Sequence, residues 1–209
     1  MKIIKLTGIS LFLTFKLCAQ GTNNDFGYDK EDINVIFKEL GISTFKFPIK
    51  QNTGQLVNII FEEYENRELL QKISIIDDIR RAFEEIGVDG LSYFNPQKDS
   101  IYFHRFYFFK NDSIVKIRLK AHGVEAPKEF DLKGKSLYAI NTDNGIDVSS
   151  KNDQYVEVGD ESKILLYLYA NSIEEKDKPL WCPNGLSKEQ LIERFHYFIF
   201  VSVELYKEE

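Results

Sequence analysis

Cysteine is almost absent from this chain of 209 residues, which contains only Cys18 and Cys182. We expect the amino-terminal segment that holds Cys18 to be removed, so that Cys182 has no partner for an internal disulfide. A chain of this length buries a core large enough to fold without disulfides. Because Cys182 stands in the turn-rich stretch Trp181–Gly185, we interpret it as a partly buried free thiol and not as a nucleophile.

Histidine is equally scarce, and His104, His122 and His196 lie too far apart in sequence to have the spacing of zinc ligands. The chain also has no G-x-S-x-G, H-E-x-x-H, P-loop or Rossmann glycine pattern. The oxygen-rich stretch Asn141–Asp147 lacks the spacing of an EF-hand and fits a β-turn. We therefore expect no cofactor and no metal, and we favour a binding protein over an enzyme. An extracytoplasmic hydrolase that uses scattered acids and one histidine, His104 or His122, is an alternative.

Long hydrophobic runs are missing as well, since no run approaches the roughly 20 apolar residues of a membrane-spanning helix. The chain instead begins with lysines, an apolar stretch of about ten residues and Ala19, which is the pattern of an export signal. We expect residues 1–19 to be cleaved, residues 20–27 to form a flexible leader, and the protein to be periplasmic or secreted. Two alternatives are lipidation at Cys18, which Lys16 and Leu17 disfavour, and retention of this segment in the fold.

Basic residues are outnumbered, with 27 Lys and Arg against 33 Asp and Glu and a formal net charge of −6. Removal of residues 1–19 takes away three lysines and no acid, which leaves a charge of −9. Such an excess of negative charge opposes binding to nucleic acids and to anionic membrane surfaces. The content of 43% hydrophobic and 14% aromatic residues is sufficient for a packed core. We expect one domain over residues 28–209, with a weak internal boundary near residues 90–99.

Helical periodicity is confined to a few segments. One predicted helix follows Asp29 and ends at Gly41, a second runs from Asp77 to Gly87, and a third begins at Ser187, where Gln190 completes a capping box. We expect the apolar stripes of the first two helices to be buried; they consist of Ile33, Ile36, Phe37 and Leu40, and of Ile79, Ala82, Phe83 and Ile86.

Residues 68–76 fit either a helix or a β-hairpin that turns at residues 65–67. Asp77 and Asp78, which follow directly, resemble an acid pair, but acids at these positions also stabilise the first turn of a helix. We therefore interpret Asp77 and Asp78 as helix-starting residues.

A period of two dominates the rest of the chain and predicts strands at residues 43–50, 56–64, 101–110, 114–121, 129–132, 136–141, 155–158, 163–170 and 197–206. Residues 163–170 and 197–201 are apolar on both faces, which is typical of central strands. Short turns between strands indicate antiparallel pairing. The predicted fold class is α+β, mainly antiparallel β sheet, sandwich-like over the C-terminal two-thirds, with about three peripheral α-helices.

Asn111 and Asp112 predict a two-residue turn between residues 101–110 and 114–121, which places His104 beside Leu119 on an apolar face. We interpret His104 as a residue of the core or its rim. The opposite face, here called the basic–aromatic face, then carries Phe103, Arg105, Tyr107, Phe109, Lys116, Arg118 and Lys120. Cations beside aromatic rings can hold an anionic or sugar ligand. The alternative is a solvated or helix-covered face on which basic side chains lie along the rings.

We expect an exported, soluble binding module of unknown ligand whose site is the basic–aromatic face: Phe103, Arg105, Tyr107, Lys116, Arg118 and Lys120. The expected partner is a protein, a carbohydrate or another anionic ligand, and not a nucleic acid. An inhibitor or immunity-type protein that blocks a basic partner protein is a further alternative.

Overall fold

The computed structural model describes residues 30–88, 90–110, 113–121, 124–142, 155–159, 161–172 and 186–207. The chain divides into two compact units, residues 1–40 and 41–209. In the first unit, helix α2 (Lys30–Glu39) ends just before Gly41, whose φ of 66° is one that glycine adopts readily. The side chains of its apolar stripe are between 36% and 63% exposed, so the prediction that they are buried was wrong. Amphipathic periodicity identifies a stripe but not the surface that covers it.

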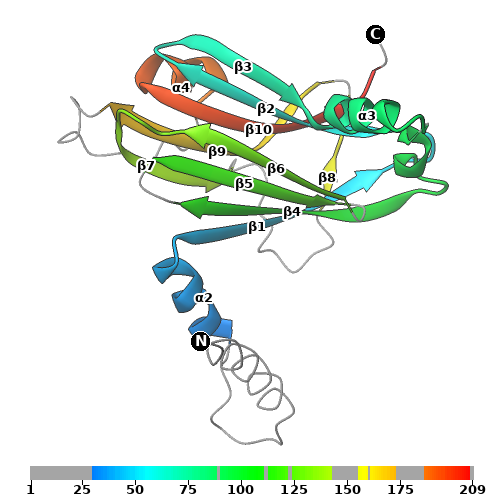
Figure 1. The fold of residues 1–209 in the computed structure, drawn as a ribbon, viewed down its shortest axis with the longest axis horizontal. Coiled ribbons are helices and arrows are strands. Elements are labelled where there is room, and N and C mark those ends of the chain that lie inside the picture. The colour runs from blue at the N-terminus through cyan, green and yellow to red at the C-terminus, as the bar shows by residue number, and fades with distance from the viewer. Residues whose placement is uncertain are drawn as a thin grey trace, which may run out of the picture. The chain divides into compact units, whose positions relative to one another are not determined.

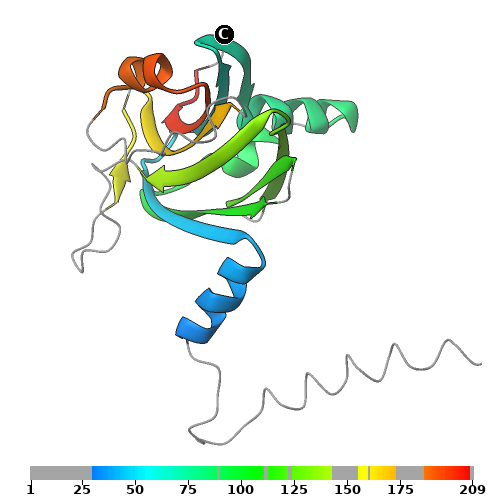
Figure 2. The same cartoon turned by 90° about the vertical axis from the view of Figure 1, so that its left-hand side faces the viewer.

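The second unit contains two five-stranded sheets in its described part (Figures 1 and 2). Sheet A has the order β6 (Val124–Asp131), β5 (Ile114–Ala121), β4 (Ser100–Lys110), β1 (Ile42–Gln51) and β8 (Val156–Glu157). Sheet B has the order β3 (Glu68–Ser74), β2 (Val57–Glu65), β10 (Tyr197–Leu205), β9 (Lys163–Ser172) and β7 (Lys135–Thr142). All pairings are antiparallel except that of β1 with β8. This arrangement confirms the predicted α+β class and the central position of β9 and β10.

The inner faces of the two sheets share one hydrophobic core. Phe47 on β1 and Phe106 on β4 are fully buried, with their ring centroids 5.8 Å apart in an edge-to-face arrangement. Phe61 on β2 reaches across to Phe130 on β6, 6.0 Å between centroids, and so links sheet B to sheet A. Each buried ring contributes about 1.5–3 kcal/mol through removal of apolar surface from water.

The β2–β3 hairpin turns at Asn66 and Arg67, which both have positive φ. Helix α3 (Ile75–Glu85) begins directly after β3. Residues 68–74 are therefore a strand. Ser74 caps α3 by accepting a hydrogen bond from the backbone N–H of Asp77 at 3.1 Å, which confirms the interpretation of Asp77 and Asp78 as first-turn acids. The helix begins earlier than predicted and buries Ile75 and Ile76, whereas Ala82 and Ile86 of the predicted stripe are exposed. A 3₁₀ turn, η1 (Leu91–Phe94), follows.

Helix α4 (Lys188–Arg194) covers part of the outer face of sheet B. It begins with the predicted capping box of Ser187 and Gln190, and its Leu191 packs against the aromatic cluster Tyr167, Tyr169, Phe198 and Phe200. Neither α3 nor α4 lies on the outer face of sheet A (Figures 1 and 2). No helix in the described part of the chain is long and apolar enough to span a membrane.

Candidate functional site

The β4–β5 pairing determines which side chains share the candidate face. Phe106 pairs with Leu119 and Lys110 with Val115, so four residues lie between the last paired residues of the two strands, where two were predicted. The predicted register was therefore wrong by two residues; Asn111 and Asp112 themselves lie outside the described residues. Side chains alternate between the faces of a strand, so an even shift leaves every residue on its predicted face. His104, predicted beside Leu119, instead pairs with Phe47 of β1 and lies on the inner face, 3% exposed.

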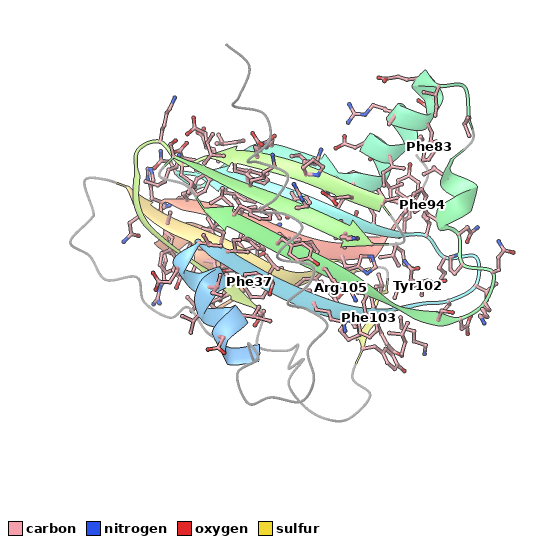
Figure 3. The ribbon with its side chains drawn as sticks, turned by 60° about the horizontal axis from the view of Figure 1, so that its bottom comes forward. Phe37, Phe83, Phe94, Tyr102, Phe103 and Arg105 are labelled. Atoms are coloured by element: carbon pink, nitrogen blue, oxygen red, sulfur yellow. The ribbon has the colours of Figure 1, made fainter. Side chains whose placement is uncertain are left out.

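The basic–aromatic face forms the outer surface of β4 and β5, as the sequence predicts. Phe103 is 44% exposed, and Arg105 beside it on the same strand is also exposed (Figure 3). The remaining members of the face are half-buried or exposed: Tyr107, Phe109, Lys116, Arg118 and Lys120. Sequence reasoning missed the contribution of β1, which pairs with β4 and brings Lys46 directly opposite Arg105.

Three cations form a row across three neighbouring strands. Lys120 on β5 pairs with Arg105 on β4, which pairs with Lys46 on β1. We call Lys46, Arg105 and Lys120 the cation row. Because neighbouring strands lie about 4.8 Å apart, the backbone positions that carry these three side chains are closely spaced. The Nζ atom of Lys46 lies 3.8 Å from the ring centroid of Phe103, and the Cζ atom of Arg105 lies 6.0 Å from it. Within the described residues, no member of the row forms an ion pair with a carboxylate.

The other two cations of the predicted site are paired with acids of β6. Lys116 Nζ lies 2.6 Å from Glu129 Oε1, and Arg118 Nε lies 2.8 Å from Glu125 Oε1. The Arg118 contact falls short of hydrogen-bond geometry, because Nε has no hydrogen-bond partner among the described residues. Exposed pairs of this kind contribute only about 0–1 kcal/mol to stability, but they offset the charge of each cation locally. Glu125 is also the register partner of Lys120, so the positive charge of the face that no acid offsets is concentrated at Lys46 and Arg105 of the cation row.

Basic side chains also lie over aromatic rings elsewhere on the same sheet. The Cζ atom of Arg118 lies 5.4 Å from the ring centroid of Phe109, and Lys50 Nζ lies 5.0 Å from that of Tyr155. The hydroxyl of Tyr155 and the carboxylate of Glu157 raise the pKa of Lys50 above its usual 10.5. These contacts agree with the alternative interpretation of the face, in which cations lie along the rings. Lys46 over Phe103 is a contact of the same kind; the β1–β4 part differs in the exposure of its ring and in having cations without an ion pair among the described residues.

The histidines do not come together in the described part of the chain. His104 lies in sheet A, His196 precedes β10 with its Nε2 3.4 Å from Glu65 Oε1, and His122 lies outside the described residues. No group of three or more His, Cys, Asp or Glu side chains among the described residues could hold a metal ion.

A buried polar network, which sequence reasoning missed, lies on the inner face of sheet B. Glu63 is 7% exposed and accepts hydrogen bonds from the hydroxyl of Tyr197 at 2.6 Å and from Gln71 Nε2 at 2.5 Å. Burial and the Glu63 carboxylate raise the pKa of Tyr197 far above its usual 10, so its hydroxyl stays a donor. Next to it, Lys135 Nζ pairs with Glu65 at 2.8 Å. Since Glu63 is held by two donors, we assign this network a structural role.

Comparison with known proteins finds no protein-family model that matches this chain, and no curated protein or solved structure with significant similarity to it.

Proposed function

We propose that this protein is an exported binding module that captures an anionic saccharide through the cation row and Phe103. One observation supports the proposal above all. On a chain of net charge −6, three adjacent cations have no ion pair with a carboxylate among the described residues, and two of them, Lys46 and Arg105, lie close to the exposed ring of Phe103. A cluster of cations without an acid partner attracts anions, also on a chain whose net charge is negative.

Each group has a distinct task in this proposal. The guanidinium of Arg105 binds a carboxylate or sulfate group through two parallel hydrogen bonds, and the lysines at either side of it add point charges. Lys46 lies over the Phe103 ring, and the exposed part of the ring offers an apolar surface on which a sugar ring can stack. The ligand therefore combines anionic groups with a ring, which describes a sulfated or uronic-acid saccharide.

An acidic protein segment is the competing ligand. In an extended peptide, side chains on the same side repeat about every 6.8 Å, against roughly 4.8 Å between neighbouring strands of the row. The exposed Phe103 ring also gives an acidic peptide no specific partner. Both observations favour the saccharide.

Binding to heparin, a sulfated polysaccharide, tests the proposal by titration calorimetry at about 0.15 M salt, where charges separated by more than about 8 Å are screened. We expect Lys46→Gln and Arg105→Gln each to weaken binding by about tenfold, the loss of one charge-assisted hydrogen bond. Lys116→Gln removes the same charge from the same sheet face and is the matched control; it should weaken binding by less than about threefold, because Glu129 already offsets Lys116.

Two results would contradict the proposal. If Lys46→Gln and Arg105→Gln bind heparin as the unaltered protein does, the cation row is not the site. If poly-glutamate binds more tightly than heparin, the row recognises an acidic protein segment and not a saccharide. Thermal unfolding of each variant checks that the loss of binding does not come from loss of the fold, since exposed substitutions shift stability by only about 0.5 kcal/mol.

A further inference from the structure

A small cavity lies where α3 and η1 meet the ends of the two sheets. The cavity is open to solvent on one side; the space in it that admits water-sized groups is about 40 Å³, and its empty volume including the open mouth is about 430 Å³. Most of its wall is apolar and comes from β2, α3, η1, β5 and β6, with Ile59, Ile79, Phe94 and Ala126 as representatives. Among the described residues of this wall, the two polar side chains are Gln51 and His104.

Gln51 carries an unsatisfied hydrogen-bond acceptor into this apolar wall. Its side chain is 2% exposed, and its Oε1 atom has no hydrogen-bond partner among the described residues. A buried acceptor without a partner destabilises the fold, so a ligand that donates a hydrogen bond to it is bound more tightly for that reason. Gln51 thus marks one end of the cavity as the place for an O–H or N–H group.

Helix α3 covers the cavity but is held mainly by its first turn. Ile76 is 4% exposed and lines the cavity, whereas Ile86 just beyond the helix is 68% exposed, and the helix projects away from the sheets (Figure 2). Asp78 of this first turn also pairs with Lys128 on β6. Beyond it, Ile79 packs against the core and the Phe83 ring contacts Phe94 of η1 (Figure 3). An element with few buried contacts opens at low free-energy cost.

We propose that this cavity is a binding site for a small, largely apolar molecule that carries a single hydrogen-bond donor, with α3 as its lid. This combination of an apolar wall and a small number of placed polar groups is that of small-molecule sites in general. The space of about 40 Å³ in the cavity is far smaller than the roughly 300–1,000 Å³ of small-molecule sites, so a ligand of that class binds with α3 displaced outward. The ligand's donor bonds to Gln51 Oε1, and its apolar body contacts the wall formed by Ile59 and Ala126. This site is separate from the cation row, which lies on the outer face of sheet A.

N-phenyl-1-naphthylamine is the probe for this proposal, because it is apolar, has one N–H donor and fluoresces in apolar surroundings. We expect saturable binding to the unaltered full chain at a single site. Ala126→Phe and Ala121→Leu each fill the cavity from a different strand and should weaken probe binding by about tenfold, the effect of overpacking. Lys128→Ala frees the lid and should accelerate probe association.

Gln51→Leu distinguishes a site that uses the Gln51 acceptor from an unspecific apolar surface, because it should change probe binding and stability in opposite directions. It removes the acceptor, which should weaken probe binding by about two- to tenfold, and it also removes an unsatisfied buried group, which should raise the unfolding temperature. Absence of saturable binding to the unaltered protein overturns the proposal. It is also overturned if Ala121→Leu and Gln51→Leu, both folded by circular dichroism, bind the probe as tightly as the unaltered protein.

Discussion

The hydroxyl of Tyr197 makes a well-defined polar contact inside the core. Its side chain is fully buried and donates to Glu63, which is itself 7% exposed, at 2.6 Å. Tyr197→Phe keeps the ring and its packing and removes only this donor. The remaining hydrogen bond to Glu63 comes from Gln71, so one carboxylate oxygen loses a partner in a poorly solvated position.

The expected loss of stability follows from the charge of the acceptor. A hydrogen bond to a charged group contributes about 1.5–3 kcal/mol, and Tyr197→Phe should lower the free energy of unfolding by that amount. For a chain of this size, each kcal/mol corresponds to about 2–4 °C, so the unfolding temperature should fall by about 3–12 °C.

Urea denaturation followed by circular dichroism measures this loss, with Tyr107→Phe as the matched control. Tyr107 is half-buried on the outer face of sheet A, and removal of its hydroxyl should change stability by no more than about 0.5 kcal/mol. A double-mutant cycle of Tyr197→Phe with Glu63→Gln should give a coupling energy of about 1 kcal/mol or more. If Tyr197→Phe and Tyr107→Phe lose the same small amount, the buried hydrogen bond does not stabilise the fold and the structural role of the network is refuted.

Three further predictions concern the helices. A Cβ atom at Gly90 would lie 2.1 Å from the ring of Phe83, so Gly90→Ala should lower the free energy of unfolding by about 1–3 kcal/mol in urea denaturation; unchanged stability would show that the ring yields freely. Ser187→Ala removes the cap of α4 and should cost about 1 kcal/mol and accelerate amide exchange in that helix, whereas unaltered exchange argues against the cap. Hydrogen bonding to Ser74 is the main cause that holds the pKa of Asp77 below its usual 3.8, so its carboxylate stabilises the fold above that pH and less as pH falls below it. The stability difference between the unaltered protein and Asp77→Asn should therefore shrink between pH 7 and about pH 3 in urea titrations, and a difference independent of pH contradicts the assignment.

Strand positions and faces were predictable because they depend on local periodicity. The alternation in residues 114–121 predicted β5 with its bounds, and the alternation in residues 101–110 placed Phe103 and Arg105 on the outer face. Register depends on turn length as well, and this is where the two-residue error arose. The capping box at Ser187 was predictable for the same local reason.

The composition of the site depends on long-range pairing, which no local pattern reveals. Lys46 belongs to the cation row because β1 pairs with β4, although the two strands are far apart in sequence. Lys116 and Arg118 were predicted as ligand-binding groups, but acids of β6 offset their charge. The predicted strand at residues 129–132 began too late to include Glu125, the acid that pairs with Arg118. The prediction that the apolar stripe of α2 is buried failed for a similar reason, because periodicity does not identify what a helix packs against.

The most direct test of the central claim compares two double variants of equal charge. Heparin affinity is measured for Lys46→Gln/Arg105→Gln and for Lys116→Gln/Arg118→Gln at about 0.15 M salt. The proposed site predicts a loss of about 100-fold for the first pair and of less than about threefold for the second, because acids already offset only the second pair. Equal losses in the two variants would contradict the proposed site, because binding would then follow the total charge of the face and not the cation row.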